Sequence, residues 1–198
     1  MRKAFVESLV NLAEKDDRVM LIVGDLGYGV IEPFSEKFPN SFVNAGVAEQ
    51  NMTVMAAGLA LSGRLVFTYS IANFPTIRAL EQIRNDILYH ELPVTIVSVG
   101  TGYSYGVLGY SHHALEDIGV LRSLPGIRIL SPTTDYEVHL CVALISSSPT
   151  PTYLRLDKDT SQDTKSLEVS DVTLPRLRFQ RGSRVVVLST GSIAAKVD

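Results

Sequence analysis

The 198-residue sequence contains no tryptophan and a single cysteine, Cys141. One cysteine cannot form a disulfide within the chain, nor a zinc site built from several cysteines. Because Cys141 lies in the apolar run HLCVALI, we expect a buried thiol without a chemical role. No apolar run approaches the roughly 20 residues of a membrane-spanning helix. The N-terminal segment MRKAFVESLVNLAEKDD has helical apolar spacing interrupted by acids, unlike a secretion signal. We therefore predict a cytoplasmic protein.

The net charge is also small. The sequence has 18 basic and 21 acidic residues, which gives a net charge of −3. The sequence therefore gives no reason to expect nucleic acid or an anionic membrane as a partner. Hydrophobic residues make up 45% of the chain and charged residues 20%, which excludes general disorder. A chain of this length forms one large domain, or one domain and part of another.

Short apolar runs such as VMLIVGD and PVTIVSVG alternate with segments of helical spacing, and such runs are typical of buried parallel strands. We predict strands over residues 19–25, 41–44, 64–69, 93–100, 127–132 and 152–156. We predict helices over residues 2–15, 33–38, 49–61, 76–89, 115–124 and 135–146. This alternation predicts an α/β fold with a doubly wound, mostly parallel sheet that is covered on both faces.

The composition changes after this first domain, which we place at residues 1–157. Residues 158–182 are polar and contain Pro175, and we interpret them as a linker. Residues 183–198, SRVVVLSTGSIAAKVD, then begin a new strand, a Gly-Ser turn and a helix. One such unit cannot complete a sheet, so we expect the sequence to end inside a second, incomplete α/β domain of a longer natural protein.

Glu49 is the most unusual acid of the sequence because it lies among small residues, in NAGVAEQNM, where a strand should give way to a helix. A carboxylate at this place either accepts hydrogen bonds from the free N–H groups of the helix start or contacts a ligand. Ligands of parallel sheets bind beyond the carboxyl ends of the strands, where Asp25, Asn44, Gly100 and Asp157 are also expected.

Other candidates occupy the loops at this edge. Tyr69 and Phe74, expected in the loop after the third strand, either cover the core or stack on a flat ring. His112 and its neighbour His113 are unsuited to sharing a metal ion, whereas one of them is suited to proton transfer or to contacting substrate oxygens. Lys158 is either solvated or meets an anionic group.

The segment GDLGYG, which contains Asp25, lacks the glycine spacing of the dinucleotide-binding fingerprint. We therefore interpret its glycines as turn residues. Asp25 itself is either a turn former or a site residue. These residues predict an α/β domain with a polar edge but do not define a reaction.

Three segments in order make the sequence similar to transketolase-like enzymes over about residues 3–157. VNAGVAEQNM resembles their strand, turn and helix, in which a Glu binds the aminopyrimidine of thiamine diphosphate. TYSIANFPTIRALEQIRND resembles the segment that supplies their aromatic stacking residue. GYSHHALEDIGVLRSLPGIRILSPTTDYEV is similar to their histidine-bearing loop, helix and following strand. The resemblance implies the pyrimidine-binding domain of the thiamine-diphosphate-binding fold.

The resemblance also implies roles for individual residues. Glu49 would contact the N1′ nitrogen of the aminopyrimidine, and Phe74 would stack on this ring with Ile71 lining the pocket. Asp25 would lie near the thiazolium ring. His112 would contact substrate oxygens, and Lys158 would reach a sugar phosphate.

The family arrangement implies that thiamine diphosphate binds at a subunit interface. A partner subunit or domain would hold the diphosphate and Mg²⁺, since this sequence lacks the corresponding metal motif and is expected to bind no metal itself. We interpret the chain as the C-terminal or small subunit, or a fragment, of a split transketolase that moves a two-carbon ketol unit between sugar phosphates. The assembly would be a homodimer or a heterotetramer.

Two departures from the family pattern concern substrate recognition, since Leu108 replaces an acid and Gly100 replaces a histidine. Alternative interpretations are the beta subunit of a 2-oxo acid dehydrogenase, a deoxyxylulose-phosphate synthase-like enzyme, and a non-catalytic assembly subunit.

Overall fold

The computed structural model describes residues 1–158 and 189–193. Its sheet has six strands in the order β2-β1-β3-β4-β6-β5, and each neighbouring pair is parallel. The strands are β1 Val19–Val23, β2 Phe42–Asn44, β3 Leu65–Ile71, β4 Val94–Val99, β5 Arg128–Leu130 and β6 Thr152–Leu156. The predicted α/β fold class is confirmed.

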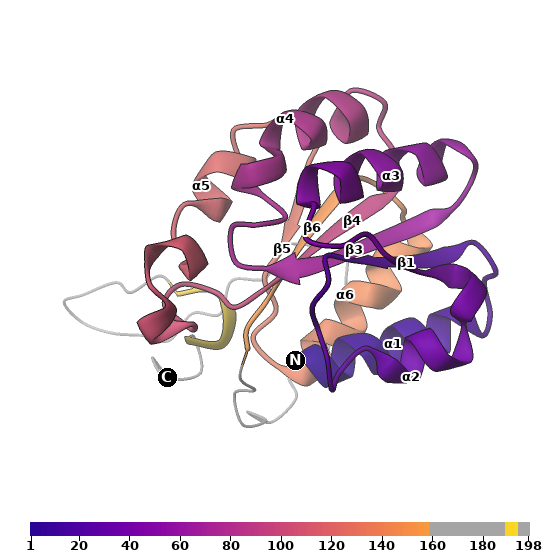
Figure 1. Ribbon diagram of the computed structural model, residues 1–198, viewed down its shortest axis with the longest axis horizontal. Coiled ribbons are helices and arrows are strands. Elements are labelled where there is room, and N and C mark those ends of the chain that lie inside the picture. The colour runs from indigo at the N-terminus through magenta and orange to yellow at the C-terminus, as the bar shows by residue number, and fades with distance from the viewer. Residues whose placement is uncertain (159–188, 194–198) are drawn as a thin grey trace, which may run out of the picture.

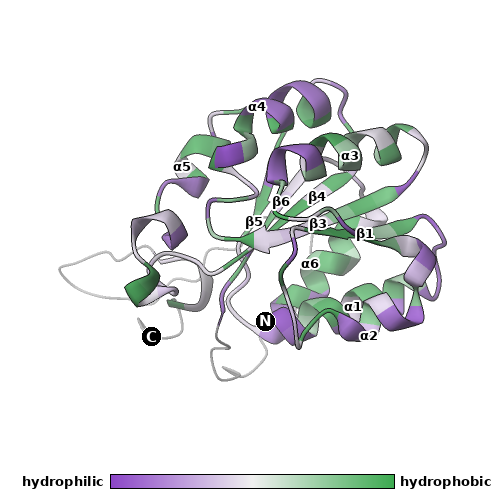
Figure 2. Cartoon of the chain, viewed as in Figure 1, coloured by the Kyte–Doolittle hydropathy of each residue, from purple (hydrophilic) through white to green (hydrophobic). Residues whose placement is uncertain are grey.

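Helices cover both faces of the sheet, as Figure 1 shows. One face carries α1 (Arg2–Ala13), α2 (Glu32–Lys37) and α6 (Asp135–Ser147). The other face carries α3 (Glu49–Leu61), α4 (Leu80–Gln82) and α5 (Asp117–Leu121). The strands and the inner sides of the helices are largely hydrophobic (Figure 2).

Each face of the sheet has its own hydrophobic cluster, because successive residues of a strand point to opposite faces. Leu21 of β1 packs with Phe5 of α1 in one cluster. The next residue, Ile22, packs with Met52 of α3 in the other cluster. Burial on both faces explains why the strands are continuous apolar runs rather than alternating ones.

The order of the strands creates a place where neighbouring connections diverge. From β1 the chain first moves outward to β2 and then returns to β3 on the other side of β1. Farther along, β5 lies at the sheet edge and β6 returns beside β4. The loops after β1 and β3 therefore frame a crevice at the carboxyl edge, where ligands of such sheets bind.

Most predicted elements are present with shifted ends, and α3 and β6 have the predicted bounds. Strand β3, however, continues to Ile71, and the loop that we expected to carry Tyr69 begins only after it. Tyr69 is instead a buried strand residue whose ring stacks on Phe5, with centroids 6.0 Å apart. Its apolar ring is part of the cluster beneath α1, which explains why Tyr69 lies in the strand and not in the loop.

The predicted helix over residues 76–89 is not uniform. It begins as a 3-10 turn at Ile77–Ala79, continues through α4 and ends as a π-helix at Ile83–Leu88. Ile83 and Ile87 are fully buried, as predicted, but Ile77 is exposed. The tight first turn rotates Ile77 away from the face that the later residues bury.

The predicted helix over residues 115–124 is shorter, since α5 spans only Asp117–Leu121. An antiparallel bridge pairs Ala114 with Gly102 through two backbone hydrogen bonds of 3.0 Å. The bridge keeps the backbone at Ala114 extended and delays the start of the helix.

Most of the predicted linker 158–182 and of the predicted second domain 183–198 lies outside the described residues, so these boundaries remain predictions. Within the described segment 189–193, residues Gly191–Ile193 form a 3-10 turn. Gly191 is buried, and the hydroxyl of Ser192 donates to the carboxylate of Asp157.

Candidate functional site

Glu49 begins α3 at the carboxyl edge of the sheet, and its side chain is only 1% exposed. Its Oε2 accepts a hydrogen bond from Nη1 of Arg78 at 2.8 Å. Its Oε1 lies 3.5 Å from the hydroxyl of Ser70 on β3. The carboxylate is thus directed toward the loop after β3, and its buried charge is balanced by a cation from that loop.

Phe74 lies in the same loop and is covered by Arg78. The guanidinium carbon of Arg78 is 4.3 Å from the centroid of the Phe74 ring, a cation–π contact. The ring of His112 meets Phe74 edge-on with centroids 5.1 Å apart. The structure therefore brings Glu49, Phe74 and His112 into one continuous group of contacts, although they are far apart in the sequence.

A hollow of about 290 Å³ opens beside this group. It is lined by Asn73, Phe74, Ile77, Arg78, Tyr110, Ser111 and Glu116. Its walls come from the loop after β3 and from the loop between β4 and α5. The amide of Asn73 donates to the carbonyl of His113 at 2.5 Å and fastens these two loops together.

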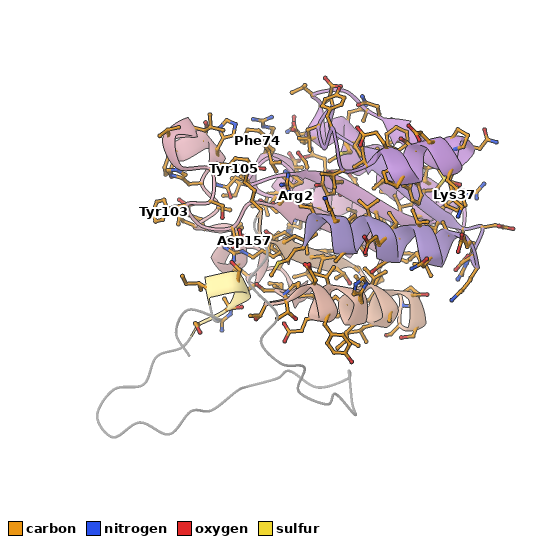
Figure 3. The ribbon with its side chains drawn as sticks, turned by 90° about the horizontal axis from the view of Figure 1, so that it is seen from below. Arg2, Lys37, Phe74, Tyr103, Tyr105 and Asp157 are labelled. Atoms are coloured by element: carbon orange, nitrogen blue, oxygen red, sulfur yellow. The ribbon has the colours of Figure 1, made fainter. Side chains whose placement is uncertain are left out.

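Asp25 follows β1 and belongs to a second hollow of about 280 Å³ that Ile71, Tyr69, Arg2 and Tyr105 also line. Figure 3 shows Phe74, Tyr105 and Arg2 at the same end of the molecule, opposite Lys37. The two predicted cofactor residues Asp25 and Ile71 thus lie together, in a different hollow from the one that Phe74 lines.

Asp25 has a positive φ of 56° and is held by hydrogen bonds. Its Oδ1 accepts from Nδ2 of Asn44 at 2.9 Å and from the hydroxyl of Tyr28 at 2.7 Å. These two donors, that of Asn44 first, lower the pKa of the Asp25 carboxyl. In the same segment Gly27 has a φ of 96°, and a Cβ there would lie 2.9 Å from Ile31. The interpretation of this glycine as a turn residue is confirmed.

Tyr105 joins the two hollows, because it lines the second one and contacts residues beside the first. Its ring lies 5.9 Å from that of His112 between centroids, and Nζ of Lys158 lies 5.3 Å from the Tyr105 centroid. Burial raises the pKa of the Tyr105 phenol. The predicted substrate residues His112 and Lys158 therefore flank one aromatic ring.

The same ring covers the end of β4. A Cβ at Gly100, whose φ is 92°, would lie 2.0 Å from Cε2 of Tyr105. The position at which the family pattern has a histidine is therefore filled by the ring of Tyr105, which is supplied by the following loop.

Asp157 at the end of β6 fixes this loop in place. Its carboxylate accepts from Ser104 at 2.8 Å and Thr101 at 3.1 Å, and also from Ser192. Burial opposes the charge, but these hydroxyl donors and the backbone N–H of Lys158 outweigh it, so the pKa of Asp157 is lowered. The loop that carries Tyr105 and His112 is thus anchored at its start.

Among residues 1–158 and 189–193, no group of three or more His, Cys, Asp or Glu side chains is arranged to hold a metal ion. The side chains of His112 and His113 have different hydrogen-bond partners. Nδ1 of His112 lies 3.0 Å from the hydroxyl of Ser111, and Nε2 of His113 lies 3.0 Å from the carbonyl of Gly106.

In the same described part of the chain, no helix is long and apolar enough to cross a membrane.

Sequence reasoning missed Arg78 and Tyr105. Arg78 pairs with an acid 29 residues earlier, a separation at which sequence spacing gives no information. A weak signal existed, since Arg78 follows the predicted stacking residue Phe74 by four positions, about one helical turn. Tyr105 lies in a loop of irregular structure, where periodicity predicts nothing.

Comparison with known proteins identifies the family of this site. Residues 1–162 match the family model described as transketolase, pyrimidine binding domain. The chain belongs to this family. It is 39% identical over 159 residues to a putative transketolase C-terminal section of Methanocaldococcus jannaschii, covering 80% of this chain and 50% of that protein.

The chain is also similar to two proteins that are described as parts of transketolases. It is 37% identical over 158 residues to one subunit of an apulose-4-phosphate transketolase of Phocaeicola vulgatus, covering 79% of this chain and 51% of that relative. A solved split-gene transketolase, described as an inactive beta4 tetramer, superposes with a TM-score of 0.74 at 31% identity, covering 85% of this chain and 54% of that one. The chain spans about half the length of these relatives.

Proposed function

We propose that this chain is the pyrimidine-binding part of a thiamine-diphosphate-dependent transketolase that transfers a two-carbon ketol unit between sugar phosphates. The observation that carries the proposal is a buried carboxylate, Glu49, at a helix start, linked to the ring of Phe74 through the guanidinium of Arg78. The family match over residues 1–162 supports it.

The residues present fit the aminopyrimidine. A planar guanidinium already lies against the face of Phe74 while donating an N–H to Glu49. The two side chains can therefore bind a flat, nitrogen-bearing group from its face and its edge at once. Ala45, Gly46 and Ala48 precede the acid and add little bulk.

Thiamine diphosphate would supply the carbanion chemistry of ketol transfer, and the protein would bind, orient and shield it. Glu49 would hold a proton at the ring nitrogen that it faces, and Phe74 would fix the plane of that ring. Asp25 and Ile71, which share the second hollow, would lie toward the positively charged ring of the cofactor.

His112 and Lys158 would contact the substrate, because they flank Tyr105 between the two hollows. His112 suits the hydroxyl and carbonyl oxygens of a sugar, and Lys158 suits a phosphate. With Gly100 at the end of β4 and Tyr105 above it, the walls of the site differ from those of the family pattern.

The diphosphate and Mg²⁺ would be held by a second polypeptide or domain. One relative is named as a single subunit of a transketolase and another is described as an inactive beta4 tetramer, and both descriptions support a partner requirement. The complete enzyme would be a homodimer or a heterotetramer with cofactor sites at its interfaces.

The test combines the chain with its partner subunit, thiamine diphosphate and Mg²⁺, and compares ketose phosphates with pyruvate as donors. We expect ketol transfer, and we expect Glu49→Gln to lower turnover by at least about 100-fold, the lower range for loss of a general acid–base group. Glu14→Gln, which alters an exposed ion pair with Lys37, is the matched control and should leave turnover unchanged.

Two results would contradict the proposal. Undiminished turnover of Glu49→Gln would remove the assigned role of this acid. Turnover with pyruvate but not with ketose phosphates would replace the transketolase proposal with a 2-oxo acid dehydrogenase or a deoxyxylulose-phosphate synthase-like reaction.

A further inference from the structure

Arg78 makes the two contacts that the proposed function requires of the aminopyrimidine. Its Nη1 donates to the buried Oε2 of Glu49 at 2.8 Å, and its guanidinium carbon lies 4.3 Å from the centroid of Phe74. A guanidinium is flat, delocalised and rich in N–H donors, so it satisfies an acid and an aromatic face at once.

While Arg78 makes these two contacts, a second planar group cannot make them as well. One face of Phe74 is covered by the guanidinium and one oxygen of Glu49 is occupied by it, while the other oxygen has the hydroxyl of Ser70 at 3.5 Å. A ring that approached Glu49 along the face of Phe74 would therefore meet Arg78 first.

The side chain of Arg78 is also able to move away from Glu49 and Phe74. Its side chain is 46% exposed, whereas that of Glu49 is 1% exposed. It projects from the 3-10 turn Ile77–Ala79, and its backbone N–H makes a long bond of 3.4 Å to the carbonyl of Asn73. A long, half-exposed side chain rotates into solvent without any change in the sheet.

We propose that Arg78 is a placeholder for the aminopyrimidine: it neutralises Glu49 and covers Phe74, and it must swing out before the cofactor ring can enter. This inference rests on the proposed function and adds a competing residue to it. It assigns the chain a built-in occupant of the site, which lowers the affinity of any planar compound that must replace both contacts of the arginine.

Competition of this kind multiplies the intrinsic affinity for the ligand by the fraction of time that the site is open. The ion pair has one exposed partner and the cation–π contact is partly solvated, and each is therefore worth a modest amount. We expect removal of the guanidinium to raise the affinity for the cofactor about threefold to tenfold.

The experiment combines the ¹⁵N-labelled chain with its partner subunit and Mg²⁺ and titrates the complex with thiamine diphosphate, by calorimetry and by ¹⁵N NMR of arginine side chains. Arg78→Gln keeps a planar donor without the charge, and Arg78→Met removes both. Arg84→Gln is the matched control, since Arg84 is exposed on the same helical segment and contacts Asn85. Thermal unfolding of each variant shows that it is folded.

We expect both Arg78 variants to bind more tightly than the wild type, and Arg84→Gln to bind equally. In the wild type, the Arg78 signals, shifted by the Phe74 ring, should move toward solvent-exposed values as ligand is added. A merely structural arginine would not show this movement.

The outcomes separate the two proposals. Binding that depends on Glu49 but is unchanged or weakened in both Arg78 variants would overturn the placeholder and leave the proposed function standing. If neither the wild type nor any Arg78 variant binds thiamine diphosphate in the complex with the partner subunit, the pyrimidine site itself is refuted, and the placeholder with it.

Discussion

Gly100→Ala tests the contact between the end of β4 and Tyr105, and the structure gives the size of the effect. A Cβ at this position would lie 2.0 Å from Cε2 and 2.6 Å from Cδ2 of the ring, so the ring must move. The φ of 92° adds backbone strain for any residue with a side chain.

The two costs can be separated. Backbone strain at a positive φ costs about 1 kcal/mol for alanine. Displacing a packed ring by overpacking costs about 2 kcal/mol. We therefore expect Gly100→Ala to lower the free energy of unfolding by about 3 kcal/mol, or the urea midpoint by about 1.5 M for an m-value of about 2 kcal/mol/M.

Gly63→Ala is the matched control. Gly63 has a φ of 93°, and a Cβ there would have no heavy atom within 4 Å. Urea unfolding of both variants should therefore show a larger loss at Gly100, and the excess should vanish in a Tyr105→Ala background, since that background removes the clash.

Equal losses at the two glycines would refute the reasoning, because they would show that the ring does not rest on Gly100. An excess that persists without Tyr105 would also refute it, since another group would then cause the clash.

Three further predictions concern buried groups. Asp117→Ala should lower the free energy of unfolding by about 4 kcal/mol in urea titrations. The substitution removes the acceptor of two buried donors, Arg155 Nε at 2.7 Å and the Tyr153 hydroxyl at 2.6 Å from Asp117 Oδ2. A loss below about 1 kcal/mol would contradict this prediction. Burial raises the pKa of Tyr69 and of Tyr153, so their stabilising effect is complete below about pH 10 and falls at higher pH. Absorbance at 295 nm should show both ionising only on unfolding, whereas eight tyrosines titrating together in the folded protein would contradict this. Cys141, expected to be buried, is only half-buried, but burial still raises the pKa of its thiol to about 12. Iodoacetamide at pH 8 should therefore modify it slowly until urea is added, and rapid modification of the folded chain would contradict this.

Much of the fold follows from the sequence because periodicity reports burial. The strands are buried on both faces and are therefore continuous apolar runs, and α3 ends at Leu61, just before Ser62 and Gly63, as predicted. The failures arise where tertiary contacts override local preference. Tyr69 belongs to β3 and not to the following loop because its ring packs on Phe5, and residue 114 is held extended by its bridge to Gly102.

The candidate site was less accessible to such reasoning. Glu49 was conspicuous because its neighbours are small, whereas the positions proposed for Phe74 and His112 came from the resemblance. Arg78 and Tyr105 were missed because their importance lies in contacts across the fold, with partners that neither spacing nor composition indicates.

The carboxylate of Asp157 gathers hydroxyl donors from two separate stretches of chain: the start of the β4–α5 loop through Thr101 and Ser104, and the segment 189–193 through Ser192. The carboxylate of Asp157 therefore links the β4–α5 loop to the segment 189–193 through shared hydrogen bonds. Any rearrangement that displaces Ser192 would therefore also disturb the anchoring of the loop that carries Tyr105 and His112.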